Sequence, residues 1–186
     1  MSNVIEKVED YVSSSSVSPE MLMEKLTEFL AVEKGGVKLY ETALQIVRDP
    51  ELQDTVRRFH EQTKKHVTIL TRVIRDFGGD PETMTPAAKV ATEKGEALLK
   101  TMSNPDRLSG KAVEINAIEN IVLAETKDHA DWELLGKIAR RSKDEIIRDI
   151  LKPAVDEVEP EEDDHLSWAK EQMAKLSFMS LARDGA

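Results

Sequence analysis

Four polar interruptions fall on the apolar faces of the predicted long helices, each near the middle of its helix. In chain order they are Glu33, Thr63 with His66, Glu125, and Glu162 with His165. A carboxylate on a buried helix face is costly unless a neighbouring group neutralises it. Carboxylates and imidazoles that meet at one level of a helical bundle are ligands for metal ions. The pattern therefore predicts a metal site inside a bundle.

The spacing of these residues indicates a dinuclear site. Carboxylate-bridged di-iron and di-manganese sites use a Glu from each of two helices and a Glu-x-x-His pair from each of the other two, because positions i and i+3 share one helix face. Glu162 and His165 match such a pair. Glu33 and Glu125 supply the single carboxylates of the first and third long helices. These four residues are predicted ligands.

The second long helix departs from the dinuclear pattern. It has His66 at the second position of its pair but Thr63 at the first, so one ligand is missing. Glu61 is no replacement, because two residues turn a helix by about 200° and direct its side chain to solvent. Asp128 on the third long helix, or His60 one turn from Thr63, could complete the site asymmetrically.

Oxygen and imidazole ligands suit iron or manganese, and zinc is a further alternative. We expect two iron ions, of which the second binds weakly because its ligand set is incomplete. The chain contains no cysteine, which excludes disulfides and thiolate metal sites.

The composition narrows the class of protein. The 186 residues suffice for one domain with a sizeable core. The formal net charge of -10, without a basic stripe, argues against nucleic acid as a partner. No apolar run approaches the roughly 20 residues that a membrane span needs, and the first residues, which include Ser2, Asn3 and Glu6, do not form a basic region ahead of an apolar core. We therefore expect a cytoplasmic protein that binds neither nucleic acid nor membrane, and we expect a homodimer.

The elements that must position the ligands are helices. Residues 1–17 include four consecutive serines and have little to bury, which predicts a flexible leader ahead of a bundle domain over residues 18–182. The Ser-Pro-Glu run at 18–20 is a helix start. Periodicity and turn signals predict helices over Pro19 to Arg48, Pro50 to the Gly78-Gly79 pair, Pro86 to Met102, Ser109 to Arg140, and from a Ser142/Glu145 capping box onward.

The order of these helices predicts an all-α fold, namely a four-helix bundle that runs up and down with one long crossover. The shortest helix lies inside the crossover, which a break at Asn104-Pro105 closes. The apolar register of the last helix continues through Pro153 and Pro160, so we expect kinks there. The alternative is a break at Pro160, followed by a separate helix with an acidic first turn.

Simpler interpretations exist for several of these residues. Tyr40, Trp132 and Trp168 are interpreted as core filling, with a redox role for Tyr40 as the alternative. The acids beside Glu162, which are Glu161, Asp163 and Asp164, are interpreted as a solvated face, with attraction of cations toward the centre as the alternative. A lone histidine such as His60 or His129 is more often a hydrogen-bonded core residue than a ligand. The alternative for the whole chain is a metal-free structural or protein-interaction bundle.

Three motifs of the chain resemble the ferritin-like superfamily. Glu33 is followed seven residues later by Tyr40, as in the first helix of that group, and His66 is followed twelve residues later by a Gly-Gly pair. The run Glu162-Asp163-Asp164-His165 resembles the fourth-helix motif. The resemblance implies a ferritin-like bundle with a dinuclear metal site that reacts with oxygen or peroxide.

Within that superfamily the chain is most similar to the YciE/YciF-type stress-associated proteins, over Leu22 to about Gln172. The segments that carry this similarity are 31–34, 50–52, 60–63 and 125–132, together with the crossover helix. The resemblance implies a role in oxidant or iron handling under stress. Thr63 replaces the superfamily's Glu, which argues against ferroxidase chemistry, although Thr is usual in this branch.

Overall fold

The computed structural model describes residues 17–102, 108 and 110–182. Within these residues the chain forms five helices and no strand, which confirms the all-α prediction. The helices are α2 (Pro19–Ile46), α3 (Pro50–Asp76), α4 (Pro86–Met102), α5 (Lys111–Arg141) and α6 (Glu145–Leu181). Nearly all of the predicted leader at 1–17, and the predicted break at Asn104-Pro105, lie outside the described residues.

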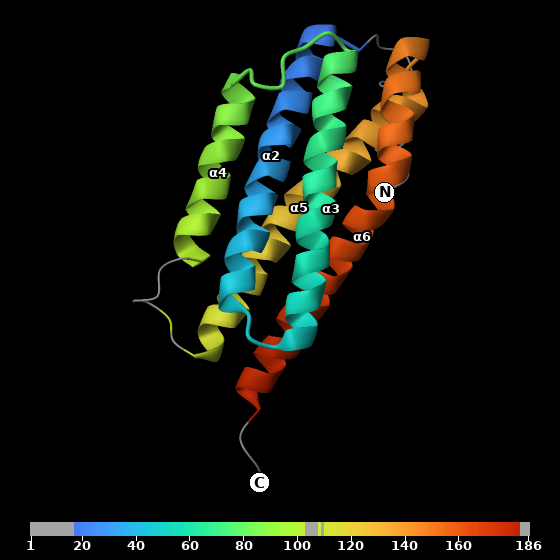
Figure 1. Cartoon of the computed structure of the whole chain (residues 1–186). Coiled ribbons are helices and arrows are strands. Elements are labelled where there is room, and N and C mark those ends of the chain that lie inside the picture. The colour runs from blue at the N-terminus through green and yellow to red at the C-terminus, as the bar shows by residue number, and fades with distance from the viewer. Residues whose placement is uncertain (1–16, 103–107, 109, 183–186) are drawn as a thin grey trace, which may run out of the picture.

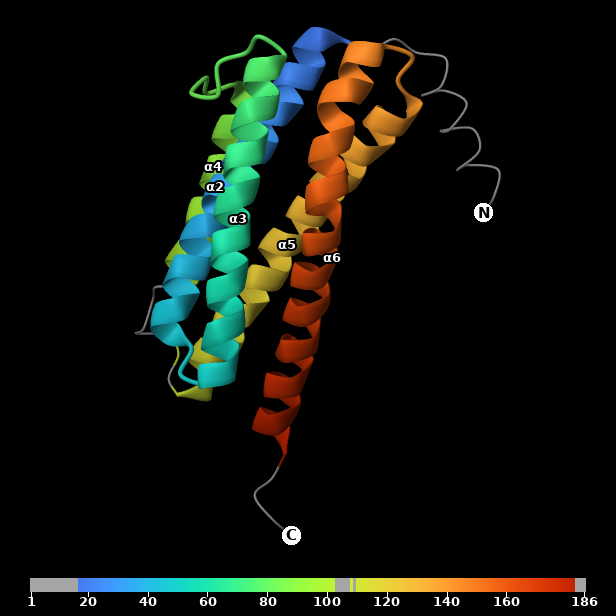
Figure 2. The ribbon, with the colours of Figure 1, turned by 45° about the vertical axis from the view of Figure 1, so that its right-hand side comes forward.

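The four long helices form one bundle, and the shorter α4 lies against its outside (Figure 1). Helices α2 and α3 are antiparallel and are joined by a short turn. Helix α4 packs against α2 and carries the chain back along the bundle, so that α5 runs parallel to α3 and antiparallel to α6 (Figure 2). The up-down topology with a helix inside one long crossover is therefore confirmed.

Side-chain caps and a glycine define the helix ends. Ser18 Oγ accepts from the Met21 N–H over 3.4 Å, and Asp49 Oδ1 accepts from the Glu51 N–H over 2.9 Å. Gly78, with a φ of 79°, follows the end of α3 in the left-handed conformation that glycine favours. Helix α2 ends at Ile46, two residues before the predicted Arg48, since Asp49 turns out of the helix to cap α3.

The predicted start of the last helix was two residues too early. Asp144, not Ser142, caps α6, and its Oδ1 accepts from the Ile146 N–H over 2.9 Å. The Ser142 hydroxyl accepts instead from the Asp144 N–H over 3.1 Å, in the turn between α5 and α6. A carboxylate competes successfully with a hydroxyl for this position because it also interacts favourably with the helix dipole.

Helix α6 continues through Pro153 and Pro160. The alternative break at Pro160 was therefore wrong. Each proline removes one backbone hydrogen bond. The buried residues Val155, Val158 and Glu162 nevertheless keep one helical register on the inner face, and their packing holds the helix together.

The apolar core consists of two clusters, one toward each end of the bundle. The first includes Leu26, Leu70, Trp132 and Leu151, and the second includes Ala43, Val56, Ile118 and Ala169. In each long helix, buried polar residues stand between the two clusters in sequence. They include Glu33 in α2, Thr63 and His66 in α3, Glu125 and Asp128 in α5, and Glu162 and His165 in α6. We call these seven residues the central layer.

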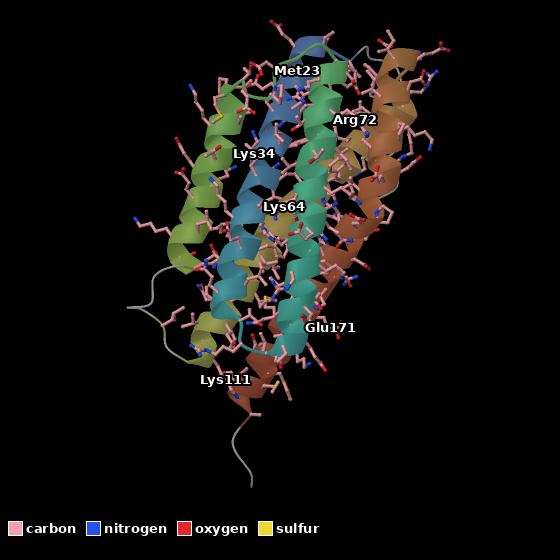
Figure 3. All side chains as sticks on the ribbon, viewed as in Figure 1. Met23, Lys34, Lys64, Arg72, Lys111 and Glu171 are labelled. Carbon is pink, nitrogen blue, oxygen red and sulfur yellow. The ribbon has the colours of Figure 1, made fainter. Side chains whose placement is uncertain are left out.

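The outer surface of the bundle is rich in charged side chains, whereas its interior is apolar apart from the central layer and a few other buried polar residues. Figure 3 shows Lys34, Lys64 and Arg72 on the outward sides of α2 and α3. None of the described helices is both long enough and apolar enough to cross a membrane.

Candidate metal centre

Five acidic and histidine residues of the central layer form two groups. Glu33, His66 and Glu162 make the first group, and Glu125, Glu162 and His165 make the second. Within each group, one nitrogen or oxygen atom of every residue lies within 4.8 Å of the others, and all five residues are fully buried. Glu162 belongs to both groups. The sequence-predicted ligands Glu33, His66, Glu125, Glu162 and His165 are thus brought together around one shared carboxylate.

Both histidines direct the same ring nitrogen into the centre. His66 Nδ1 lies 2.9 Å from Glu162 Oε1 and 3.5 Å from Glu33 Oε1. His165 Nδ1 lies 3.4 Å from Glu125 Oε2 and 3.5 Å from Glu162 Oε1. The two imidazole rings are stacked, with 5.7 Å between their centroids and an interplanar angle of 26°. The i and i+3 spacing in α6 places Glu162 and His165 on one face.

Most of these buried polar atoms make no hydrogen bond of acceptable geometry, although a histidine nitrogen lies within ion-pair distance of a carboxylate oxygen in several places. They are Glu33 Oε2, His66 Nδ1, Glu125 Oε2, Asp128 Oδ1, both oxygens of Glu162, and His165 Nδ1. A buried polar atom without a partner costs about 1–3 kcal/mol, so one cluster of seven is unusual in a folded protein. Each atom is a nitrogen or oxygen of the type that coordinates a metal ion. The donor set therefore fits one or two metal ions.

Electrostatic repulsion within the central layer also favours a cation. Burial, followed by the charges of Asp128 and Glu125, raises the pKa of Glu162 well above its usual value. Burial, followed by the charges of Glu33 and Glu125, does the same to the pKa of Asp128. Burial alone would lower the pKa of His66, but the neighbouring carboxylates outweigh it and raise that pKa. A bound cation would relieve the repulsion among the acids.

The outer nitrogen of each histidine has its own partner. His66 Nε2 lies 2.8 Å from Glu161 Oε2, and Lys65 Nζ donates to Glu161 Oε1 over 2.7 Å. Burial would raise the pKa of Glu161, but the hydrogen bonds from Lys65 and His66 lower it below its usual value. His165 Nε2 lies 3.1 Å from Gln62 Oε1. Both interactions link α3 to α6.

The interpretation of Glu161 as part of a solvated face was wrong, since its side chain is 24% exposed and bonded through both oxygens. Asp163 and Asp164 are exposed, as predicted. Asp163 Oδ1 lies 2.7 Å from His129 Nε2, and His129 belongs to neither group.

Two aromatic residues bind carboxylates of the centre. The Tyr40 hydroxyl donates to Glu125 Oε1 over 2.8 Å, and the Trp132 indole N–H donates to Glu33 Oε1 over 2.7 Å. Burial, together with the Glu125 charge, raises the pKa of Tyr40 well above its usual value. Both side chains fill the core as predicted, and each also orients a carboxylate. Sequence reasoning did not reveal this second role.

Thr63 is buried at the expected level, but it makes only a local hydrogen bond. Its hydroxyl donates to the Phe59 carbonyl over 2.9 Å, and its methyl group lies 3.3 Å from the point where a Cβ atom at Gly36 would stand. Helices α2 and α3 therefore approach each other closely here. Glu61 is 64% exposed and accepts from Lys64, in agreement with the prediction that it faces solvent.

The two candidate replacements lie in different surroundings. Asp128 is buried beside Glu33 and Glu125, and the charges of these two residues help to raise its pKa. It is not a member of either group. His60 lies on the half-buried side of α3, where its Nδ1 is 3.6 Å from Glu61 Oε1, and it too belongs to neither group. Asp128 is therefore the better placed of the two to contribute a ligand.

Comparison with known proteins gives one partial match. Residues 21–107 match the family model described as "Domain of unknown function (DUF2383)". The match covers α2, α3 and α4, and so includes Glu33 and His66 but not the ligand candidates of α5 and α6. No curated protein matches the chain, and no solved structure does.

Proposed function

We propose that this chain is a ferritin-like protein that holds two metal ions, and that it uses them to react with oxygen or peroxide in oxidant or iron handling under stress. Iron is the proposed metal, with manganese or zinc as the alternatives. The observation that carries the proposal is the set of buried, unpartnered nitrogen and oxygen atoms that face one another between the two apolar clusters. The resemblance to the YciE/YciF-type proteins supports the same function.

The candidate ligands form two sets, one for each proposed ion. Glu33 and His66 would hold one ion, Glu125 and His165 would hold the other, and Glu162 would contact both because it belongs to both groups. Asp128 is a further buried carboxylate beside Glu33 and Glu125. Redox-active metals at such a centre supply electrons to oxygen or peroxide and act as Lewis acids.

The protein contributes orientation and exclusion of water. Tyr40 and Trp132 fix one oxygen each of Glu125 and Glu33, which leaves the other oxygen of each carboxylate free to bind. The apolar clusters on both sides keep bulk water from the centre, and this strengthens every electrostatic interaction inside it. Because Thr63 provides no ligand, the ligand set is one short of the six-residue pattern and leaves coordination positions for a small molecule.

Metal content and oxygen consumption test the proposal together. The chain should be purified without chelators, loaded anaerobically with ferrous ion, dialysed and analysed for iron, and then exposed to oxygen or peroxide. We expect iron that resists dialysis and an oxidation rate well above that of free ferrous ion. Iron near zero, with the fold intact by circular dichroism, would favour the metal-free structural or interaction bundle instead.

A further inference from the structure

The two histidines of the candidate metal centre differ in the group that holds their outer nitrogen. His66 Nε2 meets a carboxylate oxygen of Glu161, whereas His165 Nε2 meets the amide oxygen of Gln62. Both rings are buried and both direct Nδ1 toward Glu162. The outer partner is the difference that bears on which ring nitrogen carries the proton.

A carboxylate and an amide constrain an imidazole differently. An ionised carboxylate only accepts hydrogen bonds, so Glu161 requires the proton on His66 to be at Nε2 and leaves Nδ1 as a lone pair that faces the centre. An amide can present either its oxygen or its NH2 group. Gln62 can therefore accept from His165 Nε2 or, after a flip, donate to it, and the second arrangement moves the proton of a neutral His165 ring to Nδ1.

The surroundings reinforce this difference. Glu161 is fixed at both oxygens, by His66 and by Lys65, and Lys65 Nζ also lies 3.6 Å from Glu157. For Gln62 the only side-chain hydrogen bond found in the described part of the chain is the one to His165, and its amide nitrogen has no partner there. Glu161 is thus held in one orientation by two partners, while the Gln62 side chain is held by one hydrogen bond.

We propose that Glu161 is a positioning residue that makes the His66 half of the centre the tighter metal position, while Gln62 leaves the His165 half the weaker one. This inference rests on the proposed function. A carboxylate behind a histidine fixes the tautomer and increases the electron density on the coordinating nitrogen, and loss of such a partner typically weakens metal binding about 10- to 100-fold. The first ion to bind should therefore bind at His66, Glu33 and Glu162.

Exchange of the two outer groups gives the sharpest test. The unmodified chain, Glu161→Gln and Gln62→Glu should each be titrated with Co2+, whose absorption spectrum reports coordination. Glu61→Gln is the matched control, because it removes one acid from an exposed position of α3. The unmodified chain should bind in two steps of unequal affinity. Glu161→Gln should weaken the first step about 10- to 100-fold, Gln62→Glu should tighten the second, and the control should change neither.

Nitrogen-15 NMR of the metal-free protein, labelled at histidine, provides a readout that needs no metal. It should be recorded at a pH where both rings are neutral. His66 should carry its proton at Nε2 alone, and His165 should populate both tautomers. Glu161→Gln should make His66 resemble His165, and Gln62→Glu should give His165 a single tautomer.

The outcomes distinguish a failure of the proposed function from a failure of this inference alone. If no Co2+ binds to any of the folded proteins, the proposed function fails and this inference fails with it. Two bound ions of equal affinity, or equal effects of Glu161→Gln and Glu61→Gln, would overturn this inference alone. Identical tautomer populations at His66 and His165 in the unmodified chain would also overturn it. Circular dichroism of each variant verifies that the fold is intact.

Discussion

Trp132 and Glu33 are joined across the bundle by a hydrogen bond of 2.7 Å from the indole N–H of α5 to a carboxylate of α2. A second hydrogen bond runs in the opposite sense, from the Tyr40 hydroxyl of α2 to Glu125 of α5 over 2.8 Å. Each of these two helices therefore supplies one carboxylate to the centre and one aromatic donor that orients the carboxylate of the other. The arrangement fixes the rotation of α2 and α5 relative to each other.

Removal of either donor should destabilise the metal-free protein. Trp132→Phe and Tyr40→Phe leave a buried carboxylate oxygen without its partner, which costs about 1–3 kcal/mol in the free energy of unfolding. Urea denaturation of the metal-free protein measures this quantity. Trp168→Phe is the control, because the half-buried Trp168 donates to no carboxylate in the described residues. A loss in Trp132→Phe no greater than in the control would show that the indole N–H contributes nothing.

Glu162 should matter more for metal content than its neighbour Glu161. Glu162 is buried and belongs to both groups, whereas Glu161 contacts the centre only through His66. Glu162→Ala should lose both ions, and Glu161→Ala should retain at least one, as measured by elemental analysis after dialysis. Equal losses in the two variants would mean that the register of α6 beyond Pro160 differs from the one described.

The stability of the metal-free protein should decrease as pH rises from 6 to 8. The folded-state pKa values of Glu162 and Asp128 lie well above their ordinary values, so the folded protein binds more protons than the unfolded chain over this window. The raised pKa of His66 acts in the same direction, because its stabilisation is lost as pH rises through that pKa. The lowered pKa of His60 opposes them, but that side chain is partly exposed and its effect is small.

Thermal unfolding at pH 6 and pH 8, with and without metal, measures this dependence. The midpoint of the metal-free protein should be lower at pH 8. The increase caused by metal should be larger at pH 8, because a metal ion displaces protons from its ligands. A midpoint that rises with pH in the absence of metal would contradict the assignment of the acids in the central layer.

Thr63→Glu should increase occupancy by the second ion. The new carboxylate would stand at the position where the dinuclear pattern has its sixth ligand, and the rate of ferrous oxidation by oxygen should rise with it. The close approach of Gly36 leaves little room, so some loss of stability should accompany the gain. Thr63→Gln, of similar size but uncharged, is the control. Two equal, tight sites in the unmodified chain, with no change in Thr63→Glu, would indicate that Asp128 or His60 already completes the centre.

The sequence predicted the helices well because each depends on local signals. A cap-plus-proline start at Thr85-Pro86 and a break signal at Asn104-Pro105 in the sequence located α4 at Pro86–Met102, as observed. Apolar periodicity identified Glu33 and Glu125 as interruptions, since a polar residue in an apolar stripe is visible without a structure. The error at Ser142 was also local: two possible caps stand two residues apart, and the sequence does not determine which one the helix uses.

The residues around the ligands could not be predicted in this way. Glu161 and Gln62 meet histidines on neighbouring helices, and those contacts depend on the rotation and spacing of α3 against α6. Tyr40 and Trp132 occupy apolar positions, where their polar atoms give no periodic signal. Contacts of long sequence separation are set by packing between helices, which single-helix patterns do not encode.

Anomalous X-ray diffraction from crystals of the iron-loaded protein tests the central claim most directly. Data collected on either side of the iron absorption edge should show two peaks per chain, one near His66 Nδ1 and one near His165 Nδ1, with Glu162 between them. Data at the manganese and zinc edges would identify either alternative metal by the same two positions. A protein that carries bound iron but shows no anomalous peak among Glu33, His66 and Glu162, or among Glu125, Glu162 and His165, would contradict the account.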